Sequence, residues 1–161
     1  MNLSVRPFDP ADSDALATIL NDIIIAGGTT AYETPFTPMQ LRDKLHGSPT
    51  VLCCHTVLQG DVPVGYQVLN SHPRLPDGVG DIASFTRRNP PAKGAGRLLF
   101  AATQARARLL GLAWLNATIR ADNVPGLSYY RKMGFVEYAR SEAVPLTDGT
   151  PVDRLHHRFD L

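Results

Sequence analysis

The apolar residues of this sequence change their spacing along the chain, and that change limits the folds it can adopt. In residues 12–25 they recur at helical intervals, and the run stops at Gly27-Gly28. Residues 50–58 and 62–71 are instead rich in Val, Leu, Thr and Tyr, with a turn-forming Gln-Gly-Asp between them. A helical stripe returns in residues 95–111. This alternation predicts a sheet covered by helices.

Further elements follow from local signals. We expect strands at 2–6, 79–86, 112–119, 135–144 and 152–161, and short helices from Thr37 and over 125–132. Thr37 precedes Pro38 and, three positions on, Gln40, which is the pattern of a capping box. The order lacks the repeated βαβ units of a doubly wound dinucleotide fold. The sequence therefore predicts a single α+β or α/β domain over residues 1–161 with an antiparallel meander.

Composition narrows the partners and the compartment. Sixteen basic residues oppose fifteen acidic ones, so no strong net field attracts nucleic acid or an anionic membrane. The N-terminus has no secretory signal pattern, and no apolar run reaches the roughly 20 residues that span a bilayer. Cys53 and Cys54 are neighbours in the sequence, so a disulfide between them would be badly strained. We expect two reduced thiols, a cytoplasmic location and no metal site.

The segment from Ser84 to Leu99 has the strongest chemical signal. A strand enters a loop holding Gly94 and Gly96, and a long helix begins at once. Backbone N–H groups and the positive end of the helix dipole make such a turn a phosphate site, and Lys93 and Arg97 add charge. Glycines that serve only helix packing are the alternative. Neither the Walker pattern nor the dinucleotide pattern is present.

Two segments carry a family resemblance. Pro91-Ala-Lys-Gly94-Ala-Gly96 resembles motif A of the GNAT superfamily of N-acetyltransferases, Gln/Arg-x-x-Gly-x-Gly/Ala, with proline in the first position. Asn123 to Phe135 resembles that family's Asn-x-x-Ala-x-x-x-Tyr-x-x-x-Gly-Phe, with Gly126 in place of alanine. The opening Val-Arg-Pro-Phe-Asp-Pro-Ala-Asp and the loop Thr-Thr-Ala-Tyr-Glu are most similar to phosphinothricin-type acetyltransferases.

The resemblance implies a GNAT-like mixed, mostly antiparallel, splayed sheet with helices on both faces. It implies acetyl transfer from acetyl-CoA to a primary amine of a small molecule, by direct attack in a ternary complex. It also implies a homodimer that buries the last hairpin. The expected cofactor-binding residues are Phe85, Thr86, Lys93, Gly94, Ala95, Gly96, Arg97, Leu98 and Asn123. Capping of the following helix is an equal explanation for Asn123.

Two residues are candidates for acid and base. On the resemblance, Tyr130 protonates the leaving thiolate, and a phenol with a pKa of about 10 is protonated at neutral pH. Packing of a short helix on the sheet is the alternative role for Tyr130. Asp81, on the strand that enters the glycine loop, could remove the ammonium proton through water. A solvent-facing carboxylate is the alternative for Asp81, and His72 is a further candidate base.

The sequence does not identify the amine acceptor. The loop with Tyr32, Glu33 and Phe36 lies where the family closes over its acceptor, so these residues could shape an amine pocket. An amino acid, a xenobiotic amine, an aminoglycoside and a protein N-terminus all remain possible acceptors. A non-catalytic acyl-CoA sensor on the same fold and a generic phosphate-binding module are the alternative functions.

Overall fold

A computed structural model describes residues 2–161 of the chain. The strands are β1 Leu3–Pro7, β2 Val51–Gln59, β3 Val62–Asn70, β4 Val79–Thr86, β5 Trp114–Arg120, β6 Val136–Pro145 and β7 Pro151–Asp160. The helices are the 3-10 turn η1 Pro10–Asp12, α1 Ser13–Ala26, α2 Pro38–Leu45, α3 Ala95–Leu109 and α4 Val124–Met133. Each expected element is therefore present, and the largest shifts are of two residues: the strand expected at 112–119 begins at Trp114, and the helix expected over 95–111 ends at Leu109.

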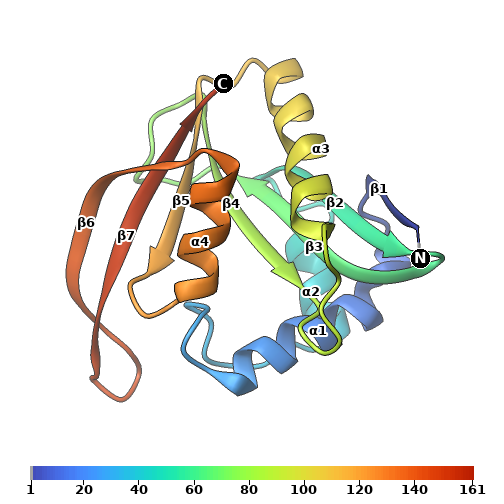
Figure 1. The fold of residues 1–161 in the computed structure, drawn as a ribbon, viewed down its shortest axis with the longest axis horizontal. Coiled ribbons are helices and arrows are strands. Elements are labelled where there is room, and N and C mark those ends of the chain that lie inside the picture. The colour runs from blue at the N-terminus through green and yellow to red at the C-terminus, as the bar shows by residue number, and fades with distance from the viewer. Residues whose placement is uncertain (1) are drawn as a thin grey trace.

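The strands form one seven-stranded sheet in the order β1-β2-β3-β4-β5-β7-β6. Neighbouring strands are antiparallel except β4 and β5, which run parallel. Figure 1 shows these two central strands diverging from a shared starting point. The predicted fold class, a mixed and mostly antiparallel open sheet, is confirmed.

Helices cover both faces of the sheet. The apolar stripe of α1, including Leu16 and Leu20, packs with α2 on the face of β3 that carries Tyr66. On the other face, Phe100 of α3 and Leu127 of α4 pack over Leu115 and other residues of the central strands. Figure 1 shows α3 and α4 in front of the sheet. The central strands are therefore covered on both faces, whereas β6 is largely exposed.

The helix ends follow the expected signals. Thr37 Oγ1 accepts a hydrogen bond from Gln40 N at 3.1 Å, and Gln40 Oε1 accepts one from Thr37 N at 2.9 Å. The predicted capping box is therefore confirmed. Helix α1 ends at Gly27, whose φ of 70° lies in the left-handed region that favours glycine.

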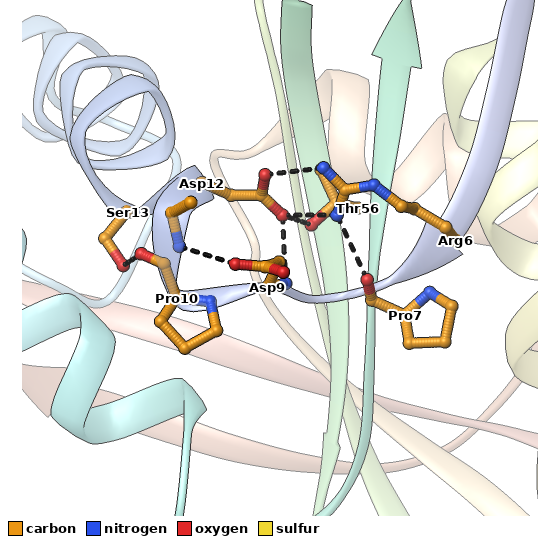
Figure 2. Close-up of polar contacts among 8 residues, drawn as sticks. Arg6, Pro7, Asp9, Pro10, Asp12, Ser13 and Thr56 are labelled. Carbon is orange, nitrogen blue, oxygen red and sulfur yellow. Dashed lines mark hydrogen bonds and ion pairs between the residues drawn. The ribbon is translucent and has the colours of Figure 1, made fainter. Parts of the chain in front are cut away.

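An ion pair between the partly exposed Arg6 and the buried Asp12 fixes the N-terminal strand to the start of α1 (Figure 2). Both carboxylate oxygens of Asp12 accept hydrogen bonds from Arg6 at 2.8 Å, and Oδ2 also accepts from Thr56 Oγ1 at 2.8 Å and from Asp9 N at 3.0 Å. Burial alone would raise the pKa of Asp12, but these hydrogen bonds and the Arg6 charge outweigh it and hold that pKa below its ordinary value. One carboxylate therefore joins β1, η1 and β2.

The two cysteines are free thiols on opposite faces of β2, as strand alternation requires. Burial raises the pKa of Cys53 to about 11, and that of Cys54 rises further because it is more deeply buried. Both are therefore protonated, weakly nucleophilic side chains. Within residues 2–161, none of the helices is both long and apolar enough to cross a membrane.

Strand β6 is the outer edge of the sheet, since it pairs only with β7. Val136 is 66% exposed and Tyr138 is 44% exposed on it. The predicted homodimer would bury this edge, and it stays a prediction.

Asp12→Asn should lower the free energy of unfolding at pH 7 by about 2 kcal/mol, because it weakens a buried, multiply bonded carboxylate. The loss is moderated by solvent at Arg6, whose side chain is 41% exposed. Since the folded-state pKa of Asp12 is lowered, its contribution is complete above the unfolded-state pKa of about 3.9 and is lost as the pH falls below it. Denaturant titrations of both proteins at neutral and acid pH measure this difference.

Asp43→Asn is the matched control, because Asp43 is 66% exposed in a surface pair with Arg42 and should contribute less than about 0.5 kcal/mol. Equal stability losses for the two variants would contradict the structural role of Asp12.

Candidate active site

The separation of β4 from β5 creates the main cleft of the molecule. The two strands pair only through Val79–Asp81 and Trp114–Asn116. Beyond these residues, β4 remains bonded to β3 as far as Thr86, and β5 remains bonded to β7 as far as Arg120. A cleft of about 990 Å³ lies between them and is lined from both sides, by Ile82–Thr86 and by Thr118–Arg120. The facing edge of β4 is therefore free to bond an extended ligand.

The glycine loop lies at the end of β4 and begins α3. Gly94 is the N-cap with a φ of 86°, and a Cβ there would meet only Leu3 Cδ1, at 3.9 Å. The N–H of Ala95 bonds to Ala92 O, and that of Leu98 bonds to Gly94 O. Within residues 2–161, the N–H groups of Gly96 and Arg97 have no such partner, so they are available to an anion at the helix start.

Gly96 has a packing role that the sequence left as an alternative. A Cβ at this position would lie 2.6 Å from Cε1 of Tyr129, so the ring of Tyr129 fills the space beside it. The alternative role of Gly96 in packing is therefore present, and its role in phosphate binding stays a prediction, since Gly96 also lines the cleft. Gly94 keeps the open side expected of both glycines.

The other predicted residues of this loop differ in position. Lys93 and Arg97 are exposed at the helix start, as expected for side chains that meet solvent or a charged ligand. Ala95 is fully buried against Val57, so only its backbone could meet a ligand. Leu98 is 40% exposed, and its N–H is already bonded within the helix turn. Phe85 and Thr86 line the cleft from β4.

Tyr130 lies on the α3 and α4 face of the sheet, where the cleft opens. It is 7% exposed, and its hydroxyl oxygen lies 2.8 Å from Ser84 Oγ of β4. Burial raises the pKa of Tyr130 well above its ordinary value, and the nearby Tyr129 and Asp81 add to this, whereas the Ser84 bond lowers it. Tyr130 is therefore a protonated donor at the cleft wall throughout the neutral pH range.

Asp81 reaches the same cleft from the opposite face, because side chains alternate along β4. Its Oδ1 accepts a hydrogen bond of 2.9 Å from Asn116 Nδ2 across the last β4–β5 pair. Burial raises the pKa of Asp81, while the Asn116 bond and the nearby His72 and His156 oppose the rise. Asp81 is thus a half-buried carboxylate with one oxygen bonded and a raised proton affinity.

A polar network extends from Asp81 toward the last hairpin. Asn116 Oδ1 accepts a hydrogen bond from the hydroxyl of Tyr138, and Asn116 Nδ2 also donates to Thr118 Oγ1 at 3.0 Å. Thr118 Oγ1 lies 2.8 Å from His156 Nδ1, and Ser141 Oγ lies 2.7 Å from His156 Nε2. Burial lowers the pKa of His156, which favours the neutral ring at pH 7.

These residues were not identified from the sequence. His157 is 1% exposed, and His156 belongs to the wall of the cleft. No local motif marks Asn116, Thr118 or Ser141, because their bonds to Asp81 and His156 cross from one strand to another.

The loop between α1 and α2 spans the opening. Thr29 accepts bonds from Arg88 and, through its carbonyl, from Asn123, while Arg120 donates to Thr30 O. One loop is therefore tied to both sides of the cleft. Asn123 also caps α4 by accepting from Gly126 N at 2.9 Å, so its capping role is present, and its amide nitrogen donates one of its two protons to Thr29 O.

Of the three predicted acceptor residues, Tyr32 lines the cleft, whereas Glu33 and Phe36 do not. Tyr32 lines the cleft and stacks at 6.1 Å on Phe85. Phe36 packs edge-on against Tyr32 at 5.0 Å and supports it from the core. Glu33 accepts bonds from the backbone N–H and the hydroxyl of Thr147, at 3.1 and 2.8 Å, and so joins this loop to the tip of the last hairpin. Glu33 is exposed and does not line the cleft.

Charge is distributed unevenly around the cleft. Five arginines line it: Arg74, Arg87, Arg88, Arg120 and Arg154. Asp81 is the only acidic residue of its wall within the described chain. Within residues 2–161, no group of three or more His, Cys, Asp or Glu side chains is arranged to hold a metal ion. The electrostatic environment therefore favours a polyanionic ligand.

Solved structures share this architecture. The ribosomal-protein-alanine N-acetyltransferase from Brucella melitensis matches with a TM-score of 0.86 and 22% identity, over 98% of this chain and 99% of that one. An N-acetyltransferase from Staphylococcus aureus Mu50 matches with a TM-score of 0.85 and 18% identity, over 99% of both chains. A GNAT superfamily phosphinothricin acetyltransferase from Sinorhizobium meliloti, in complex with acetyl-CoA, matches with a TM-score of 0.84 and 21% identity, over 100% of this chain and 89% of that one.

No protein-family model and no curated protein sequence matches the chain. The structural matches establish that the chain has the fold of the GNAT acetyltransferases, as its two sequence segments indicated.

Gly96→Ala should destabilise the fold by roughly 1–3 kcal/mol, because the added methyl group collides with the Tyr129 ring. The cost should fall sharply when the same change is made in a Tyr129→Ala background, where the obstructing ring is gone. A double-mutant cycle of unfolding free energies measures this coupling. Equal costs in the two backgrounds would show that Gly96 is constrained by something other than Tyr129.

Proposed function

We propose that this chain is an acetyl-CoA-dependent N-acetyltransferase that acylates a primary amine of a small molecule. One observation carries the proposal: a phenol, Tyr130, and a carboxylate, Asp81, line one cleft from opposite faces of a splayed sheet. The acetyl-CoA complex of the Sinorhizobium meliloti enzyme, which shares the fold, supports the choice of acyl donor.

The residues present fit a CoA thioester. The free N–H groups of Gly96 and Arg97 suit a pyrophosphate, and Lys93 and Arg97 supply exposed positive charge beside them. The unpaired edge of β4 beyond Asp81 suits the amide groups of the pantetheine arm, which would bond to it as an added strand does. In this proposal, backbone groups rather than particular side chains make most of the contacts with acetyl-CoA.

The chemistry then needs two proton transfers. The neutral amine attacks the thioester carbonyl carbon, the carbon–sulfur bond breaks, and the thiolate leaves. The ionised Asp81 carboxylate accepts the proton that the ammonium group must lose, either directly or through water. Tyr130 donates a proton to the departing sulfur. No covalent enzyme intermediate is required, consistent with the high thiol pKa values of Cys53 and Cys54.

Tyr130→Phe should lower kcat by roughly 10²–10⁴-fold, because it removes the proton donor and keeps the ring that packs under α4. The KM for acetyl-CoA should change little, since the lost interaction acts mainly in the transition state. Steady-state assays of thiol release, with an amine that the wild-type protein accepts, measure both values. A folded variant that binds acetyl-CoA and keeps the wild-type kcat would exclude Tyr130 as the acid.

Asp81→Asn keeps the size of the side chain and removes its ability to accept a proton. In the wild-type protein, kcat/KM should rise with pH on the acid side of its profile as Asp81 ionises. This rise should lie above the ordinary carboxyl pKa of about 3.9, because burial raises the pKa of Asp81. The rise should disappear in Asp81→Asn. Rate profiles of both proteins from roughly pH 4 to 9 test this. An unchanged rise in the variant would assign the base to another group.

A further inference from the structure

A buried chain of hydrogen bonds leads from Tyr129 to Tyr130, and its proton directions can be deduced. The hydroxyl of Tyr129 lies 2.7 Å from the carbonyl oxygen of Gly96. A carbonyl only accepts, so the single proton of Tyr129 is donated to Gly96. The oxygen of Tyr129 must therefore act as the acceptor toward its other neighbour, Gln67, at 3.0 Å.

This requirement fixes the orientation of the Gln67 amide. Its nitrogen faces Tyr129 and donates one proton there, and its second proton goes to Ser84 Oγ at 2.8 Å. Gln67 is 1% exposed, so water does not compete for these protons. Ser84 Oγ thus accepts a hydrogen bond from Gln67 of β3, and the fold fixes the direction of this bond.

One proton is then left over at the cleft. The oxygens of Ser84 and Tyr130 lie 2.8 Å apart, and a single proton joins them. The other proton of the pair has no acceptor among residues 2–161, and both hydroxyl groups belong to residues that line the cleft. A phenol is a much stronger acid than an aliphatic alcohol, so a thiolate in the cleft takes its proton from Tyr130, and Ser84 then donates to the phenol oxygen.

We propose that Gln67 and Ser84 are positioning residues for Tyr130: Gln67 commits the Ser84 oxygen as an acceptor, Ser84 donates its proton to the Tyr130 oxygen, and the Tyr130 proton is directed into the cleft. The inference rests on the proposed acetyl transfer. As Tyr130 loses its proton to the thiolate sulfur, its oxygen gains negative charge, and the bond donated by Ser84 becomes charge-assisted. The Ser84 bond also opposes the rise that burial causes in the pKa of Tyr130.

A double-mutant cycle on kcat tests the inference. Ser84→Ala should lower kcat about tenfold, with little change in the KM for acetyl-CoA, because a bond that strengthens in the transition state is lost. In a Tyr130→Phe background the same change should have no further effect, because the hydroxyl that Ser84 serves is gone. Ser84→Thr, which keeps the hydroxyl, should recover much of the loss.

A second pair of variants tests the direction of the chain. Gln67→Met removes the donor, and kcat should fall about as far as in Ser84→Ala. Gln67→Glu should have a still lower kcat, because its carboxylate only accepts and takes the proton of Ser84, which leaves the Ser84 oxygen to hold the proton of Tyr130. A folded Gln67→Glu protein with a kcat equal to or above that of Gln67→Met would overturn the inference. The Ser84 cycle needs no change at this buried position and decides the matter if Gln67→Glu does not fold.

Failure of this inference is distinct from failure of the proposed function. Wild-type kcat in Tyr130→Phe would remove the acid role itself. An impaired Tyr130→Phe, together with a Ser84→Ala effect of the same size in both backgrounds, would keep the acid role and overturn the positioning of Tyr130 by Ser84.

Discussion

The short parallel contact between β4 and β5 is the constraint on which the site depends. The pairing stops at Asp81 and Asn116, whose side chains bond to each other at 2.9 Å. Further along, each strand keeps its outer partner, since β4 follows β3 to Thr86 and β5 follows β7 to Arg120. The two halves of the sheet twist apart because their outer pairings hold them, and the inner edges are left without partners. An open edge inside a sheet is costly unless a ligand or water bonds to it.

The candidate acid and the candidate base line the cleft from different faces of the sheet. Strand alternation puts Asp81 on the face of α1 and Ser84 on the face of α3 and α4. The two groups of the proposed proton transfers, Asp81 and Tyr130, thus line the cleft from opposite faces of β4 and have no direct hydrogen bond. The loop of Thr29 and Thr30 is bonded to Arg88 on one side of the mouth and to Arg120 on the other. This arrangement would give the preorganised geometry that the proposed acyl transfer needs.

Much of this was predictable from the sequence. Hydrophobic spacing indicated the elements, because each helix and strand buries one regular face, and the capping box at Thr37 marked the start of α2. Gly94 and Tyr130 could be singled out because local motifs mark them, and their roles stay proposals. The partners of Tyr130 and Asp81 were not found, since Ser84–Tyr130 and Asp81–Asn116 are contacts between distant segments. Gly96 shows the same limit, because its neighbour Tyr129 lies 33 positions away.

Transfer of a labelled acetyl group tests most directly whether this cleft is an active site or only an acyl-CoA sensor. Acetyl-CoA labelled in its acetyl carbon would be mixed with the protein and a panel of small primary amines, including amino acids and aminoglycosides. Label should appear in one or more amines together with an equal amount of free CoA thiol, and none should remain on the protein. Tight binding of acetyl-CoA with no label in any amine would contradict the enzymatic role, and label on the protein would contradict direct attack.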